Sequence, residues 1–194
     1  FSDDFSQKHQ ELLRNFGEIF SEQKNTFELR KDEQDIARWH FLYQWKHISH
    51  NLLGEENNHY VALALDIAKD IGLELSEKQY HFHLKLQPGR LSLFSYKEHI
   101  LIDSSYNAAP ESMRQVLSNT KLIQEKLFPT YWRIAVLGDM RELEHPQEAH
   151  EHLVSELLEF SRVFTIGPNM YEYTVPKLKD LEFSGIITSS LSSR

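Results

Sequence analysis

The chain has 194 residues, 40% hydrophobic and 26% charged, which suits one sizeable domain or two small ones with a real core. The formal net charge of -8 argues against a nucleic-acid surface, which needs a clustered basic footprint. Cysteine is absent, which excludes disulfides, thiolate catalysis and thiolate zinc sites. No apolar run approaches the about 20 residues of a membrane span, and we expect no signal segment and no membrane partner.

The first stretch, up to about Asn51, is rich in charged and aromatic residues. The segment HQELLRNFGEIF has apolar residues at helical spacing, at Leu12, Leu13, Phe16, Ile19 and Phe20. NTFELR is predicted to be a short strand. In DEQDIARWHFLYQWKHI the aromatic residues alternate, which favours a strand whose aromatic stripe belongs to the core: Trp39, Phe41, Tyr43 and Trp45. The chain begins with Phe1 rather than Met, so we expect it to be a piece of something longer.

The next stretch predicts a long helix followed by a joint. NNHYVALALDIAKDIGL places five apolar residues on one helical face, namely Val61, Ala64, Leu65, Ala68 and Ile71. Gly72 fits the end of this helix. The Pro-Gly pair in Gln87–Arg90 is the best candidate for an interdomain joint.

Strands and helices alternate from there on. LSLFSY and HILID, separated by Lys97-Glu98, predict a hairpin or two adjacent strands, and a helix is expected from about Pro110. The following segments predict a buried strand, a helix, a strand, a short crossover and a last strand: RIAVLG, QEAHEHLVSELLEF, RVFTIG, MYEYTVPKLKD and SGIITSS. This order implies βαβ units and a mostly parallel sheet. The closing SSLSSR is typical of the start of another helix, so we expect the domain to be truncated there.

Small and polar residues gather at three predicted strand ends, in IDSSYNAAP, VLGDMRELEHPQEAH and FTIGPN. Ligands of open parallel sheets bind beyond the carboxyl ends of the strands. A helix that begins at Pro110 offers unpaired N–H groups and a positive dipole end to an anion. The alternative is that these serines, asparagines and prolines only cap helices and form turns. No phosphate-loop motif occurs, so a bound triphosphate would be held by something outside this chain.

Two motifs together resemble the Mur ligase family, and within it the MurF type, the UDP-N-acetylmuramoyl-tripeptide–D-alanyl-D-alanine ligases. They are GRLSLF…ILIDSSYNAAPESM and, about two dozen residues later, RIAVLGDMRELEHPQEAH. LLGEENNHYVALALDIAKDIGL is similar to the stretch that closes the family's central ATPase domain. The resemblance covers roughly Leu52 to Ser190. It implies the end of a central α/β ATPase domain over residues 1–88 and a Rossmann-like C-terminal domain over residues 89–194.

The resemblance implies an ATP-dependent amide-bond ligase of cytoplasmic peptidoglycan synthesis. Such enzymes use ATP and Mg²⁺ to convert a carboxylate into an acyl phosphate, which an amine then attacks. The implied partners are small molecules: ATP, a UDP-linked muramoyl peptide and D-alanyl-D-alanine. We expect a monomer that binds neither nucleic acid nor membrane. The fragment alone is expected to be inactive, because the phosphate loop and the residues that mainly hold ATP and Mg²⁺ would lie outside it.

The resemblance also assigns site residues by position. Arg90 matches the family's hinge arginine, which reaches the phosphates. The residues assigned to the nucleotide-facing edge are Asp103, Ser104, Tyr106 and Asn107, and Asn57 matches a kept position in the central domain. The residues assigned to the catalytic cleft through the second motif are Asp139, Glu142 and His150. The alternative for Asp139 and Glu142 is that they cap the next helix, and Arg90 has the alternative of an ordinary surface arginine.

The sequence departs from the family pattern at several positions. Ser104 stands where the family has a second aspartate; it can still donate and accept a hydrogen bond but brings no charge. Ala109 stands where the family has a second asparagine and brings neither a hydrogen bond nor a charge. Further departures are Glu56, Tyr60 and Glu144. Two alternatives therefore stay open: a Mur-like module that binds or scaffolds without catalysis, and another amide ligase of the superfamily, of the folate-polyglutamylating type.

The 11 histidines invite a metal-site hypothesis. No set of them is spaced like a known zinc site, although His145, His150 and His152 lie close together in the sequence. The sequence therefore predicts no metal site built by this chain.

Overall fold

The computed structural model describes residues 27–191, which divide into two compact units. Residues 27–30 and 38–84 belong to the first unit, and residues 31–37 and 85–191 to the second. The helix predicted for HQELLRNFGEIF lies outside the described residues. The predicted joint at Gln87–Arg90 comes a few residues after Leu84, the last residue of the first unit.

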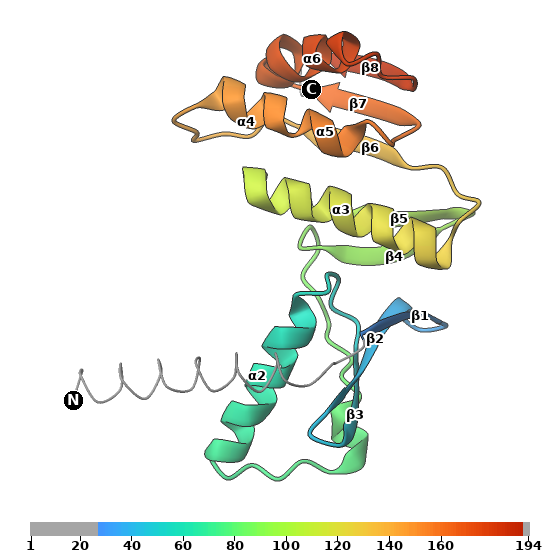
Figure 1. The fold of residues 1–194 in the computed structure, drawn as a ribbon, viewed down its shortest axis with the longest axis vertical. Helices are drawn as coiled ribbons and strands as arrows, with labels where there is room; N and C mark the ends of the chain where they lie inside the picture. Colours follow the sequence, from blue (N-terminus) through green and yellow to red (C-terminus); the bar gives the residue numbers. More distant parts are fainter. Residues whose placement is uncertain (1–26, 192–194) are drawn as a thin grey trace, which may run out of the picture. The chain divides into compact units, whose positions relative to one another are not determined.

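A sheet with strand order β1-β2-β3 is made of β1 (Glu28–Asp32), β2 (Ile36–Tyr43) and β3 (Lys46–His50) (Figure 1), and most of it belongs to the first unit. β2 and β3 pair antiparallel. The turn between them, Gln44–Trp45, has positive φ at both residues, as a type I′ hairpin turn requires. The predicted alternation on β2 is confirmed as far as Tyr43, but Trp45 is 91% exposed because it stands in the turn and not in the core.

Helix α2 (Asn57–Asp70) packs on this sheet. Its predicted end is confirmed: Gly72 has φ +81, its N–H donates to the Lys69 carbonyl, and the Leu73 N–H donates to the Ala68 carbonyl. The predicted apolar face is wrong in part. The buried helix residues are Asn58, Val61 and Ala62, whereas Ala64 is exposed and Ile71, just beyond the last helical turn, is 69% exposed.

The second unit begins with a hairpin, β4 (Ser92–Tyr96) and β5 (His99–Asp103), paired antiparallel as predicted. Helix α3 (Pro110–Leu127) comes next, with proline at its first position as predicted. Its buried residues keep to one stripe: Met113, Leu117, Asn119, Ile123 and Leu127. The one-turn helix η1 (Glu77–Tyr80) belongs to the first unit.

A parallel sheet completes the second unit, with β6 (Ile134–Gly138), β7 (Arg162–Ile166) and β8 (Ile186–Ser190) in that order. The predicted α/β class with a Rossmann-like parallel sheet is confirmed for these strands, but β5 is paired only with β4 and stands apart from them. The helix predicted after β6 is divided at Leu153 into α4 (Pro146–His152) and α5 (Val154–Leu157). The crossover after β7 consists of η2 (Met170–Thr174) and α6 (Val175–Asp180).

The core of the second unit lies on one face of the parallel sheet. Alternate strand residues such as Ala135, Leu137 and Val163 are buried against α3, α5 and α6. On the other face Ile134 is 49% and Val136 is 67% exposed. The prediction that RIAVLG is a buried strand is therefore confirmed for one face only, because the described helices cover only that face. Among the described residues, no helix is long and apolar enough to cross a membrane.

Candidate functional site

Asp103 ends β5 and organises the loop after it. Its carboxylate accepts hydrogen bonds from the backbone N–H groups of Ser105 (3.0 Å) and Gly89 (3.1 Å). Hydrogen bonds from Ser105, first from its side chain and then from its backbone, hold the pKa of Asp103 below its ordinary value, and the Gly89 N–H adds to this. The carboxylate thus stays ionised and ties the segment before β4 to the loop after β5.

Gly89 fits against the same loop because it has no side chain. Its φ is +76, its carbonyl accepts the Tyr106 N–H (3.1 Å), and a Cβ added to it would lie 3.0 Å from the Tyr106 nitrogen. This close approach places the next residue, Arg90, over the Tyr106 ring, with the guanidinium carbon 3.8 Å from the ring centroid. Both side chains are exposed, so the cationic face is open to solvent.

The remaining residues of this loop lead into α3. Ser104 is half-buried, and the Asn107 side-chain oxygen accepts the N–H of Ala108 (2.9 Å). Ala109 stands at the position before the helix and has no side-chain oxygen for the first-turn N–H groups. The Ser112 hydroxyl instead donates back to the Ala109 carbonyl (2.9 Å). The start of α3 therefore keeps N–H groups that its own cap residue does not satisfy, beside Asn107.

The loop after β6 begins with a second aspartate that accepts backbone N–H groups. The Asp139 carboxylate accepts the N–H groups of Met170 (2.8 Å) and Asn169 (3.2 Å), at the start of η2. Gly167 has φ +115, and a Cβ added there would overlap this carboxylate. Asp139 thus joins the loop after β6 to the segment after β7 through these two hydrogen bonds.

His150 lies in the core beside this loop. The ring is fully buried, its Nε2 accepts the Met140 N–H (3.2 Å), and its Nδ1 lies 2.6 Å from the Pro146 carbonyl. Because the Met140 N–H must donate, Nε2 carries no hydrogen and Nδ1 donates to Pro146. Glu142, between these residues in sequence, is exposed and has φ +57.

The structure therefore groups the predicted site residues in three places. Arg90, Asp103, Ser104, Tyr106 and Asn107 meet in what we call the β5 loop cluster, which also includes Gly89 and Ser105. Asp139, Glu142 and His150 belong to the loop after β6. Asn57 is the first residue of α2 in the first unit, where its side-chain amide bonds to the Leu53 carbonyl.

Sequence reasoning missed two members of the β5 loop cluster. The sequence predicts Gly89 only as part of an interdomain joint, although a Pro-Gly pair is also a signal for positive φ at the glycine. Ser105 comes two residues after Asp103, the spacing at which an aspartate accepts a backbone N–H in a local turn. No group of three or more histidine or carboxylate side chains within residues 27–191 is arranged to hold a metal ion.

Comparison with known proteins identifies the fold. No protein-family model matches the chain, and no curated protein matches it. Three solved structures illustrate the likeness. The first is the MurF ligase from Thermotoga maritima in complex with ADP, with a TM-score of 0.61 and 19% identity over 87% of this chain and 43% of that one.

The second is crystal structure I of MurF from Acinetobacter baumannii, with a TM-score of 0.59 and 20% identity over 86% of this chain and 41% of that one. The third is UDP-N-acetylmuramate-alanine ligase MurC from Thermotoga maritima, with a TM-score of 0.58 and 14% identity over 87% of this chain and 37% of that one. The chain thus spans roughly two fifths of the length of these ligases and shares their fold over most of its own length.

Proposed function

We propose that this chain is part of an ATP-dependent ligase of the Mur type, and that the whole protein adds D-alanyl-D-alanine to a UDP-linked muramoyl peptide through an acyl phosphate. On this proposal the first unit ends the central ATPase domain and the second is the C-terminal domain. The likeness to an ADP-bound MurF supports it, together with the two sequence motifs. The observation that carries it is the β5 loop cluster, where an exposed guanidinium lies over the Tyr106 ring in the loop that leads from the carboxyl end of β5 to α3.

The chain's own residues suit contact with a nucleotide. Arg90 offers a fixed positive charge whose orientation the Tyr106 ring sets, so it can face phosphate oxygens at little ordering cost. Asp103 holds Gly89 and the loop in place, and each of its oxygens accepts one backbone N–H and keeps a further lone pair that can face the nucleotide. The uncapped N–H groups of α3 add partial positive charge.

The same residues do not fit Mg²⁺. The Asp103 and Asp139 carboxylates are both bound to backbone N–H groups, and the described residues contain no cluster of three acidic or imidazole ligands. On this proposal the metal ion is held by residues outside this chain, and no step of the reaction is assigned to the chain through it.

A second candidate is a Mur-like module that binds or scaffolds without catalysis. Ser104 and Ala109 favour it, because Ser104 removes the charge, and Ala109 the polar side chain, that the family pattern has at these positions. The two candidates differ in whether the full-length protein turns over ATP.

The test is a ligation assay on the full-length protein that contains these residues. We expect phosphate release that depends on both D-alanyl-D-alanine and the muramoyl tripeptide substrate, whereas the 194-residue chain alone should hydrolyse no ATP. Phosphate release by the full-length protein that depends on neither D-alanyl-D-alanine nor the muramoyl tripeptide would contradict the proposed reaction. Hydrolysis of ATP by the isolated chain would contradict the proposal that the residues that hold and cleave ATP lie outside it.

A further inference from the structure

Helix α2 has a second apolar face, on the side opposite to its sheet. Val61 and Ala62 are buried in the core of the first unit, together with residues of β2 and β3. On the other side of the helix four residues recur at helical spacing and are exposed: Tyr60 (64% exposed), Ala64, Ile67 (45%) and Ile71 (69%). We call these four residues the α2 stripe. A surface helix ordinarily presents polar residues on this side, so the stripe calls for a partner.

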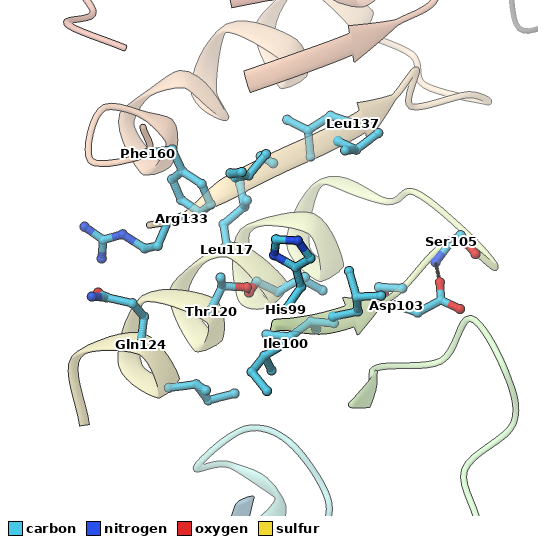
Figure 2. A pocket seen from close by; sticks show the side chains of 18 of the residues that line it. His99, Ile100, Asp103, Ser105, Leu117, Thr120, Gln124, Arg133, Leu137 and Phe160 are labelled. Atoms are coloured by element: carbon cyan, nitrogen blue, oxygen red, sulfur yellow. Dashed lines mark hydrogen bonds between the residues drawn. The ribbon is translucent and has the colours of Figure 1, made fainter. Parts of the chain in front are cut away.

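The described residues do not supply this partner. Neither hydrophobic core cluster within residues 27–191 includes a member of the α2 stripe. In the second unit, by contrast, apolar side chains such as Ile100, Leu117 and Leu137 line one shared pocket of about 690 Å³ (Figure 2). The α2 stripe instead faces solvent.

The chain itself contains a segment with a matching pattern. HQELLRNFGEIF, residues 9–20, lies outside the described residues, and its spacing predicts a helix. One face of that helix is apolar: Leu12, Leu13, Phe16, Ile19 and Phe20. The opposite face is polar and presents Glu11, Arg14 and Glu18. Such an amphipathic helix needs an apolar surface to pack on, which is what the α2 stripe offers.

The described part of the chain begins beside one end of the stripe. Phe27 packs against the core of the first unit, and its ring centroid lies 5.4 Å from that of His59, in the first turn of α2. The six residues 21–26 join Phe27 to Phe20 and reach at most about 20 Å when extended. A helix over residues 9–20 is about 18 Å long, and the stripe from Tyr60 to Ile71 is about 16 Å long. The segment therefore covers the whole stripe if it ends near Tyr60 and runs antiparallel to α2.

The antiparallel alignment determines which side chains meet. With Phe20 near Tyr60, the central Phe16 lies opposite Ala64, whose small side chain leaves room for the aromatic ring. On the flank of the pair, Lys8 then comes beside the exposed carboxylate of Asp70. Size and charge thus agree with the direction that the short connection favours.

We propose that residues 9–20 form an amphipathic helix that packs antiparallel on the α2 stripe. The first unit then has a second helix, which covers the side of α2 that faces away from the β1-β2-β3 sheet. This packing is independent of the proposed function, because no residue of the β5 loop cluster takes part in it.

Disulfide trapping in the 194-residue chain tests the packing and its register, because the chain contains no cysteine of its own. Phe16→Cys combined with Ala64→Cys should form an intramolecular disulfide under mild oxidation, detected by mass spectrometry of the linked peptides. Glu18→Cys combined with Ala64→Cys is the matched control and should cross-link at least about tenfold more slowly, since Glu18 lies on the polar face. Equal rates for the two pairs would overturn the proposal. A disulfide-linked dimer of the Ala64→Cys single variant would overturn it too, because a second copy of the chain would then occupy the stripe.

Thermal unfolding, followed by the fluorescence of buried Trp39 in the first unit, tests the same packing without cysteines. Phe16→Ala should lower Tm by about 5 °C or more, because a large apolar side chain loses its buried contacts. Arg14→Ala, on the polar face of the same segment, should leave Tm within about 2 °C of the wild type. The same Tm for Phe16→Ala and the wild type would mean that residues 9–20 do not pack on α2.

Discussion

Asp103 ends β5 and Asp139 directly follows β6, and the two carboxylates are used in closely similar ways. Asp103 accepts two backbone N–H groups, one from Gly89, and Asp139 accepts two at the start of η2 beside Gly167. Each glycine has positive φ and leaves no room for a side chain. The two loops differ in the side chains that they present. The Asp103 loop presents Arg90 and Tyr106 to solvent, whereas the Asp139 loop leads to buried His150.

This comparison shows that an acidic residue at a strand end does not by itself mark a ligand contact. Both carboxylates accept N–H groups of their own loops, and in the function proposed above the nucleotide meets Arg90, which the β5 loop cluster exposes. Substitutions in and around the two loops can break or sharpen this difference, from the largest expected change in the free energy of unfolding to the smallest.

Replacing His150 by alanine should destabilise the second unit most. The change leaves the Met140 N–H and the Pro146 carbonyl without their partner and opens a cavity, so we expect a loss of about 3 to 4 kcal/mol. Urea unfolding followed by circular dichroism measures it. The exposed His152 on the same helix is the matched control, and His152→Ala should change stability by less than about 0.5 kcal/mol. Equal losses for the two variants would contradict the buried role of His150.

The first unit offers a parallel case in His50. Its ring is fully buried, its Nδ1 accepts the Leu52 N–H (3.2 Å), and its Nε2 therefore donates to the Asn58 side-chain oxygen (2.9 Å). Burial lowers the pKa of His50 to about 4, and the hydrogen bond to Asn58 offsets this only in part. The unfolded chain takes up the proton near its ordinary pKa of 6.5.

The stabilisation linked to His50 is therefore complete above pH 6.5 and is lost as the pH falls towards 4, by up to about 3 kcal/mol. Fluorescence of buried Trp39, which is in the same unit, reports the unfolding. His50→Gln should be less stable at neutral pH but should show a flatter dependence below it. An unchanged slope in that variant would mean that another group causes the acid sensitivity.

Substituting the two aspartates compares the loops directly. Asp139→Asn places an amide donor against one of two backbone N–H groups near the buried Met170, and we expect a loss of about 2 kcal/mol. Asp103→Asn breaks the same kind of bond in a more exposed loop and should cost about 1 kcal/mol. Both values come from chemical denaturation. The reverse order would show that the β5 loop cluster is the more tightly held of the two.

Arg90 should matter least for folding and most for the proposed ligand. Its side chain is exposed, so Arg90→Ala should leave the free energy of unfolding within about 0.5 kcal/mol of the wild type. In the full-length protein the same change should lower kcat/KM for ATP by about tenfold or more, because a phosphate loses its cation. Tyr106→Phe keeps the ring under the guanidinium and serves as the control. Equal activity of the alanine variant and wild type would remove Arg90 from the site.

The local features of the fold could be predicted from the sequence. The β4–β5 hairpin, the helix from Pro110 and the end of α2 at Gly72 arise from turn chemistry and capping, which depend on neighbouring residues. Features set by distant contacts could not. The buried face of α2 depends on which residues meet β2 and β3, so Ala62 is buried and Ile71 is exposed.

In the candidate site, too, features set by neighbouring residues could be predicted and features set by distant contacts could not. The motifs correctly indicated that polar residues gather after β5, and the structure brings Arg90 and Tyr106 together there. The use of Asp139 could not be predicted, because its partners Asn169 and Met170 lie about 30 residues further on and belong to another strand end. The exposed face of β6 also depends on which helices cover the sheet, which the apolar run RIAVLG does not reveal.

Calorimetric titration of the full-length protein with ATP and Mg²⁺ tests the central claim most directly. The account predicts measurable heat of binding and an affinity that Arg90→Ala weakens but His152→Ala does not. Absence of heat in the folded wild-type protein, or equal affinity for the two variants, would contradict a nucleotide-facing role for the β5 loop cluster.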